Sequence, residues 1–176
     1  GVGDVFAADL DGDGDLDVLA ATWVGDISWY PNLGSGVFAA ERLISSLASG
    51  ARSVYAEDLD GDGDLDVLSA SYTSVADDRI AWYENDGGGG FGPQVIISTE
   101  VNGALSVHAA DIDGDGDKDV LSASVSGMKI AWYENLGGAV FGPQLLIMKP
   151  AEGASSVFSA DLDGDGDEDV LYASNQ

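Results

Sequence analysis

The sequence predicts an all-β fold of tandem four-stranded antiparallel sheets, arranged as about three and a half blades of a β-propeller. Two observations lead to this prediction. A nine-residue acidic string recurs four times, beginning at Asp9, Asp58, Asp111 and Asp161, with spacings of 49, 53 and 50 residues. The apolar residues around it form short runs, and no stretch of ten or more residues carries the 3.6-residue period of a helix. An open stacked array of the same sheets is the alternative architecture.

Each full repeat is expected to contain two β-hairpins. In the first, an apolar run precedes the acidic string and another follows it, as in SVYAED and DVLSAS of the second copy. The second hairpin consists of IAWYEN, a glycine-rich turn, and FGPQ followed by a short apolar run. Four such strands match the size of one propeller blade. The predicted units are 1–49, 50–102, 103–152 and a half repeat, 153–176, that holds the first hairpin only.

The half repeat leads to an expectation about partners. The chain holds four acidic hairpins and three Trp-Tyr hairpins, so the half blade over residues 156–174 is expected to lack its outer strands. Unpaired strand edges readily associate with other strands. We therefore expect this half blade to meet either the rest of a longer chain or a further copy of the protein, the latter giving a fibre. The sequence leaves open whether the blades close into a ring or stack in line.

Composition restricts the possible partners. The formal net charge is −26, and 20 of the 32 acidic residues are the aspartates of the four strings, which indicates four local sites. Only six Lys and Arg residues are present, so nucleic acid, which requires a basic face, is not an expected partner. No run of about 18 apolar residues is found, and no membrane insertion is expected. The chain has no cysteine and a single histidine, so a Cys-His or Ser-His-Asp site is not expected either.

The acidic string has the spacing of a calcium-binding loop. Counting from Asp9, aspartates fall at positions one, three, five, seven and nine, and Gly14 occupies position six, where a sharp turn around the ion requires positive φ. Positions one, three, five and nine are expected to supply carboxylate oxygens, and position seven its backbone carbonyl. All-oxygen ligation favours Ca²⁺ over zinc or copper, so about four ions are predicted. The predicted ligands are Asp9, Asp11, Asp13, Asp15, Asp17, Asp58, Asp60, Asp62, Asp64, Asp66, Asp111, Asp113, Asp115, Asp117, Asp119, Asp161, Asp163, Asp165, Asp167 and Asp169.

The string differs from an EF-hand, which needs a Glu at position twelve and flanking helices. Position twelve here is Ala20, Ser69, Ser122 or Tyr172. The repeats instead resemble FG-GAP repeats of the VCBS type, the calcium-bearing blades of integrin-like β-propellers. Besides the acidic string, FGP at 91–93 and 141–143 matches the Phe-Gly element, whereas the first copy has FAA at 38–40, which leaves its turn open to another geometry. The resemblance implies that the aspartates are structural calcium ligands, in rings of about seven or eight blades.

Three other features have a functional and a structural interpretation. The repeated Trp-Tyr pairs form either a sugar-stacking platform or, as we favour, packing between blades. Trp23, in a loop that is not repeated, is the better candidate for contact with a ligand or with another chain. His108 occupies the position of Phe6, Tyr55 and Phe158 in the other copies, so it is predicted to be a core aromatic residue rather than a general base.

The sequence therefore predicts a non-enzymatic, calcium-stabilised extracellular repeat module for adhesion, surface attachment or self-assembly. A carbohydrate-binding, lectin-like propeller is the first alternative, with glycans as the partner. A non-catalytic segment of a polysaccharide-degrading enzyme is the second.

Overall fold

The structure, a computed structural model, describes residues 1–73 and 77–175. Residues 74–76, in the predicted second repeat, and 176, in the predicted half repeat, lie outside the described residues. Within the described part the chain forms β-strands and no helix, as predicted, and so no helix that could cross a membrane. The strands are β1 (Val2–Ala8), β2 (Asp17–Thr22), β3 (Ile27–Tyr30), β4 (Arg42–Ser45), β5 (Ala51–Glu57), β6 (Asp66–Ser71), β7 (Arg79–Tyr83), β8 (Val95–Ser98), β9 (Ala104–Ala110), β10 (Asp119–Ser124), β11 (Lys129–Tyr133), β12 (Leu145–Met148), β13 (Ala154–Ala160) and β14 (Asp169–Ser174).

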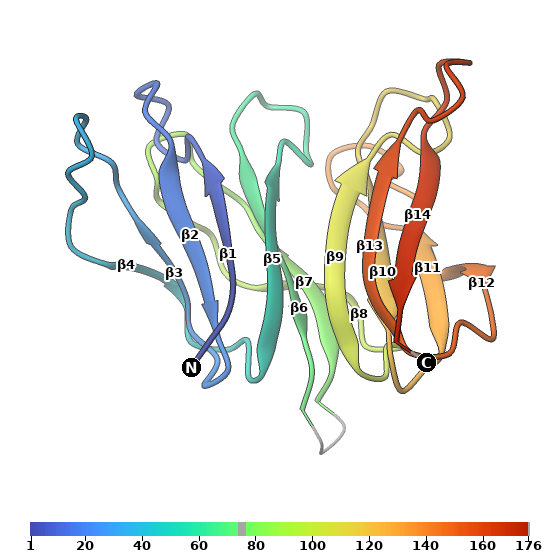
Figure 1. The fold of residues 1–176 in the computed structure, drawn as a ribbon. Coiled ribbons are helices and arrows are strands. Elements are labelled where there is room, and N and C mark those ends of the chain that lie inside the picture. The colour runs from blue at the N-terminus through green and yellow to red at the C-terminus, as the bar shows by residue number, and fades with distance from the viewer. Residues whose placement is uncertain (74–76, 176) are drawn as a thin grey trace.

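The strands form sheets in strict chain order, as the predicted blades require. Three four-stranded antiparallel sheets, β1-β2-β3-β4, β5-β6-β7-β8 and β9-β10-β11-β12, are followed by the two-stranded sheet β13-β14 (Figure 1). The first strands of the sheets, β1, β5, β9 and β13, lie side by side across the molecule. Over the described residues the sheets form an open row rather than a closed barrel. Tandem antiparallel blades are therefore confirmed, in the open arrangement that was the alternative.

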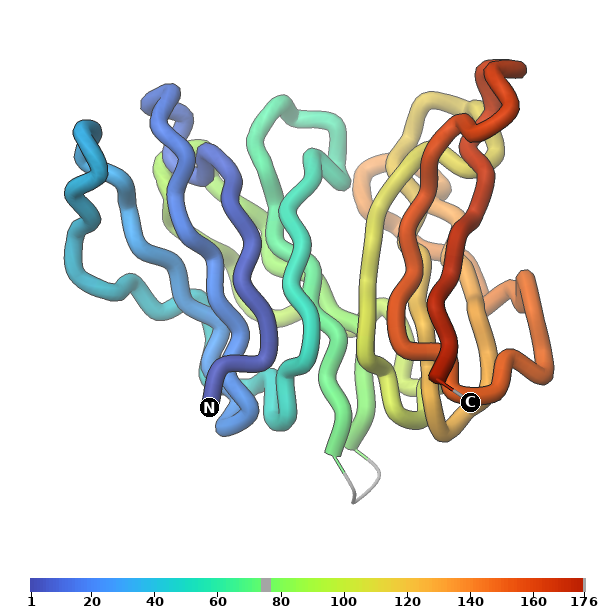
Figure 2. Tube along the Cα trace, in the orientation of Figure 1, coloured from blue at the N-terminus to red at the C-terminus, as the bar shows by residue number. Residues whose placement is uncertain are grey.

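The register places equivalent residues at equivalent positions in each blade. Leu19 pairs with Phe6 and Trp29 on its two sides, and Leu68 pairs with Tyr55 and Trp82 in the same way. Because every blade repeats this register, all four acidic loops lie at one edge of the row, opposite the two chain ends (Figure 2).

The hydrophobic core lies between blades. Side chains of a strand alternate between its two faces, so Trp and Tyr of each pair point in opposite directions. Trp29 of the first blade and Tyr83 of the second share one cluster, with 1% and 0% of their surfaces exposed. Trp82 and Tyr133 share the next cluster in the same way. The pairs therefore pack between blades, as favoured from the sequence, and do not form an exposed sugar platform.

The buried phenols have polar partners. The Tyr83 hydroxyl accepts a hydrogen bond from Gln94 Nε2 at 2.7 Å and lies 3.4 Å from Ser69 Oγ. Tyr133 repeats both contacts, with Gln144 and Ser122. A buried hydroxyl without a partner would cost about 1–3 kcal/mol, so these contacts allow a tyrosine at each blade interface.

A column of rings links the innermost strands. Phe6 lies 4.8 Å from Tyr55 between ring centroids, Tyr55 lies 4.7 Å from His108, and His108 lies 4.4 Å from Phe158. The imidazole is buried, its Nε2 lies 3.2 Å from Ser159 Oγ, and burial lowers its pKa. His108 therefore occupies a core aromatic position, as predicted.

Both ends of the row expose apolar surface that is buried at the internal interfaces. Val5 is 59% exposed, whereas its counterpart Val54 in the second blade is 2% exposed. In the half blade Leu171 is 36% exposed, whereas Leu68 and Leu121 are fully buried. Each exposed face is thus equivalent to one that packs against a neighbouring blade elsewhere in the chain.

We expect His108 to tolerate an aromatic substitution and not a small one. His108→Phe should leave the free energy of unfolding within about 1.5 kcal/mol of the parent, because it preserves the ring column. His108→Ala should cost about 2 kcal/mol or more through loss of packing. Urea titrations of both variants measure this difference, and equal losses of stability would contradict the assignment.

Candidate metal centre

The acidic loops are held by hydrogen bonds between their own aspartates and backbone amides. In the second loop, Asp58 accepts from the N–H groups of Gly61 at 2.8 Å and Gly63 at 3.1 Å. Asp62 and Asp64 donate in turn from their N–H groups to the aspartates two residues earlier. The chain therefore curls so that alternate carboxylates face a common centre.

Glycine at position six makes this curl possible. Its φ is 94° at Gly14, 99° at Gly63, 100° at Gly116 and 97° at Gly166, all in the region that disfavours a side chain. The positive φ predicted at this position is confirmed in all four loops.

Three carboxylates converge in every loop. One oxygen from each member of a trio lies within 4.8 Å of the others, a separation that one cation spans. The first three loops contribute positions one, three and five, and the fourth contributes positions one, three and nine. The trios are Asp9, Asp11 and Asp13; Asp58, Asp60 and Asp62; Asp111, Asp113 and Asp115; and Asp161, Asp163 and Asp169.

The first loop has a feature beyond the trio that favours a cation. Asp11 Oδ1 is buried and has no hydrogen-bond partner among the described residues. Burial, followed by the charges of Asp17 and Asp13, raises the pKa of the Asp11 carboxyl. A buried carboxylate oxygen without a donor, on a residue whose carboxylate converges with two others, is stabilised by a positive ion. The donor set is all oxygen and flexible, which suits Ca²⁺ better than zinc or copper.

Position nine has a role that the sequence pattern did not predict. Asp66 is fully buried, and its two oxygens accept from the backbone N–H groups of Asn85 at 2.8 Å and Leu59 at 3.1 Å. The residue thereby ties the acidic loop to the Trp-Tyr hairpin. Asp17 and Asp119 make the same two kinds of bond.

Two of these buried carboxyls, Asp66 and Asp119, have raised pKa values. Burial raises the pKa of Asp66 to about 7 and that of Asp119 to about 6, against the lowering effect of the two backbone N–H donors. In these loops the predicted contribution of position nine to the oxygen shell stays a prediction.

Position seven lies outside all four trios. The Asp64 carboxylate packs so closely over Gly87 that any side chain at position 87 would collide with it. Asp15 and Asp117 lie near Gly34 and Gly137 in the corresponding turns. The predicted use of the position-seven carbonyl as a ligand stays a prediction, as does ligation by Asp165 and Asp167.

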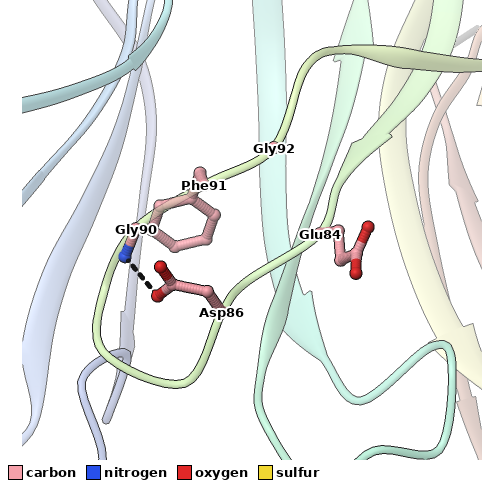
Figure 3. Close-up of a pocket in the computed structure, with 5 residues that line it drawn as sticks. All are labelled: Glu84, Asp86, Gly90, Phe91 and Gly92. Atoms are coloured by element: carbon pink, nitrogen blue, oxygen red, sulfur yellow. Dashed lines mark hydrogen bonds between the residues drawn. The ribbon is translucent and has the colours of Figure 1, made fainter.

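The turn that carries the Phe-Gly element forms a shallow pocket beside the second loop. Glu84, Asp86, Gly90, Phe91 and Gly92 line it, with a volume of about 350 Å³ (Figure 3). Asp86 accepts from the N–H groups of Gly88 at 3.0 Å and Gly90 at 2.9 Å, and these bonds lower its pKa. Asp86 therefore shapes the turn, and Phe91 reaches across to the Trp29 ring of the preceding blade.

The first blade has the same turn despite its alanines. Ala39 donates to the Pro31 carbonyl at 2.7 Å, as Gly92 does to the Glu84 carbonyl. Phe38 also forms the strand bridge to Asn32 that its counterparts form. The different geometry that the sequence allowed for this copy is therefore not found.

Trp23 lies at the opposite edge from the acidic loops, next to the chain start. Its side chain is 53% exposed, and the Arg52 guanidinium lies 4.9 Å from its ring centroid and 5.7 Å from that of Tyr72. Trp23 is thus accessible and adjoins one of the few basic groups, but it is separate from the metal centre.

Comparison with solved structures finds a fold similar to that of a lectin and a weaker match to a biofilm matrix protein. A lectin from Agrocybe aegerita superposes with a TM-score of 0.68 at 22% identity, over 96% of this chain and 45% of the lectin. The structure of that lectin describes its specific recognition of non-reducing terminal N-acetylglucosamine. The V. cholerae biofilm matrix protein Bap1 matches with a TM-score of 0.46 at 22% identity, over 96% of this chain and 27% of that protein. The chain thus spans less than half the length of each. No curated protein matches by sequence.

The sequence itself matches a family model. The model for the FG-GAP-like repeat matches three overlapping segments, 9–69, 58–122 and 114–172. Each segment begins in one acidic loop and reaches past the next, so the matches follow the spacing of the blades. Together they cover most of the chain, which therefore belongs to the family of FG-GAP-like repeat proteins.

Proposed function

We propose that the protein is a calcium-stabilised extracellular repeat module that serves adhesion, surface attachment or self-assembly. The observation that carries the proposal is the convergence of three carboxylates in each of four loops, together with a buried oxygen of Asp11 that has no hydrogen-bond partner in the part of the chain that the structure describes. Membership of the FG-GAP-like repeat family supports it. We propose no catalytic role for these blades.

Calcium would act on folding rather than on chemistry. The trio at positions one, three and five of each of the first three loops would hold an ion, and Asp161, Asp163 and Asp169 would hold the fourth. The ion supplies positive charge that offsets repulsion between carboxylates only a few ångströms apart. Four ions carry eight charges, which would change the formal net charge from −26 to −18. Ion binding and folding are therefore coupled.

The expected affinity favours an extracellular setting. Calcium sites of extracellular modules have dissociation constants of about 10⁻⁴ to 10⁻³ M, so they fill at the millimolar calcium found outside cells. The exposed faces at both ends of the row, around Val5 and Leu171, support assembly with a further blade, either of a second copy or of a longer chain.

Calcium should raise the melting temperature of the protein. The Asp60→Asn variant should melt below the parent in calcium and above it in chelator. At about 2 mM free calcium each site is expected to add roughly 1 kcal/mol to the free energy of unfolding. Asp60→Asn should lose part of this gain in calcium, yet unfold at a higher temperature than the parent in chelator because repulsion is reduced. Asp64→Asn, outside the trio, is the matched control. Melting curves identical with calcium and with chelator would refute the proposal.

The pH dependence should also differ with and without calcium. The folded-state pKa values of Asp66 and Asp119, about 7 and about 6, lie above the ordinary value of 3.8, so the folded state holds these protons more tightly. In chelator, the stability that these two carboxyls contribute should therefore fall as pH rises from about 4 to about 7. The lowered pKa of His108 opposes this fall in part, but two raised carboxyls outweigh one lowered imidazole. The gain from calcium should grow over the same range, because protons compete with the ion. Melting temperatures at pH 5 and pH 8 test this, and a rise with pH in chelator would contradict it.

Binding of glycans is the second candidate. The fold is similar to that of the lectin, and Trp23 exposes an aromatic surface beside Arg52. Titration with N-acetylglucosamine, followed by tryptophan fluorescence, should show binding that Trp23→Ala abolishes and that Val24→Ala, at the exposed neighbouring position, preserves. Absence of binding by the parent, or equal binding by Trp23→Ala, would exclude this site.

A further inference from the structure

A buried asparagine connects the acidic loops of the first and second blades. Asn85 Nδ2 donates to the carbonyl of Leu10 in the first loop at 2.8 Å and to the carbonyl of Leu65 in its own loop at 2.9 Å. Asn85 is 1% exposed, and both protons of its amide are used. The bond to Leu10 joins residues 75 positions apart in the sequence.

The same arrangement connects the second and third loops. Asn135 Nδ2 donates to the carbonyl of Leu59 in the second loop at 2.8 Å and to the carbonyl of Lys118 in the third at 3.1 Å. Asn135 is fully buried. Two independent copies of one contact show that the bridge is a regular part of the repeat.

The bridges are parts of a continuous chain of hydrogen bonds. The N–H of Leu10 donates to Asp17 in the first loop at 2.9 Å, while its carbonyl accepts from Asn85. The N–H of Asn85 donates to Asp66, whose second oxygen accepts from the N–H of Leu59. The path continues to the third loop through the Leu59 carbonyl, Asn135, Asp119 and Ile112.

The bridged carbonyls lie between predicted calcium ligands. Leu10 stands between Asp9 and Asp11, and Leu59 has the same place in the second loop. An ion that draws Asp9 and Asp11 together fixes the peptide unit that Asn85 holds. If one loop were disordered, the buried Asn85 amide would lose one of its two carbonyl acceptors, which is destabilising. An ordered first loop therefore favours the ordered form of the second, and the reverse. This is a differential interaction of the kind that allosteric coupling requires.

We propose that Asn85 and Asn135 couple neighbouring loops, so that calcium binds cooperatively to the first three. The inference rests on the proposed function, because it assumes that the loops bind calcium. The fourth loop should bind independently: among the described residues no asparagine amide bridges it to the third loop, because the half blade has no Trp-Tyr hairpin.

The chain contains its own control for the bridge. Asn32 has the equivalent place in the first blade. Its backbone N–H donates to Asp17 at 2.7 Å, and its Nδ2 donates to the Leu16 carbonyl at 2.9 Å. Its Oδ1 accepts from Gly34, as Asn85 Oδ1 does from Gly87. No bond from Asn32 to another blade is found among the described residues, so Asn32→Ala and Asn85→Ala differ in the bridge between blades.

The glycines at position six allow each loop to be followed separately. Gly14, Gly63, Gly116 and Gly166 each donate an N–H to the first aspartate of their own loop. In a calcium titration of ¹⁵N-labelled protein, their amide resonances give one binding curve per loop. Circular dichroism of each variant in calcium checks that it is folded.

The parent should show steep, coincident curves for the first three loops. Asn85→Ala should separate the curve of Gly14 from that of Gly63, with an affinity change of about five-fold or more at one of these loops. Asn32→Ala should leave them coincident. If calcium binds but Asn85→Ala and Asn32→Ala give the same binding curves for Gly14 and Gly63, the proposed coupling role of Asn85 is wrong. If the parent binds no calcium, the proposed function itself fails.

A second comparison does not need an asparagine variant and applies if Asn85→Ala fails to fold. Asp11→Asn should weaken calcium binding at the second loop, reported by Gly63. Asp163→Asn should leave binding at the third loop, reported by Gly116, unchanged, because no asparagine bridges those loops. Equal effects of the two substitutions on the neighbouring loop would overturn the inference.

Discussion

Repulsion between carboxylates within each acidic loop is the constraint on which the rest of the structure depends. Two such charges about 4 Å apart repel by roughly 4 kcal/mol at an effective dielectric of 20. The loop offsets part of this with its own backbone amides, such as those of Gly61 and Gly63 on Asp58. One oxygen from each of three carboxylates lies within 4.8 Å of the others in every loop, which leaves a place for a cation, and Asp11 Oδ1 is buried without a hydrogen-bond partner among the described residues.

The loops matter to the fold because they stand where blades meet. Asp66 holds its loop against the Trp-Tyr hairpin of its own blade, and Asn85 holds that hairpin against the loop of the preceding blade. Below them, Trp29 and Tyr83 fill the space between the two sheets. An ion that orders the loops would therefore strengthen packing between blades as well as within them, which is the property a repeat module needs to bear load or to assemble.

Local patterns in the sequence were sufficient to predict the hairpins, the positive φ at Gly63 and the core position of His108. Each depends on residues near in sequence or on comparison of the copies. The role of Asp66 could not be predicted, because its partners are backbone amides, which every residue has. The bridge from Asn85 to Leu10 spans 75 residues and depends on how blades stack. In the sequence, only the Glu-Asn pair that follows Trp-Tyr in the second and third copies pointed to this bridge.

Counting the bound ions tests the central claim most directly. Equilibrium dialysis of the protein against about 2 mM calcium, followed by elemental analysis, measures the number of ions per chain at a concentration typical for extracellular sites. We predict about three to four bound ions for the parent, and a lower number after the Asp60→Asn substitution weakens one trio and, through the asparagine bridges, its neighbours. A chain that remains folded with no saturable calcium would contradict it.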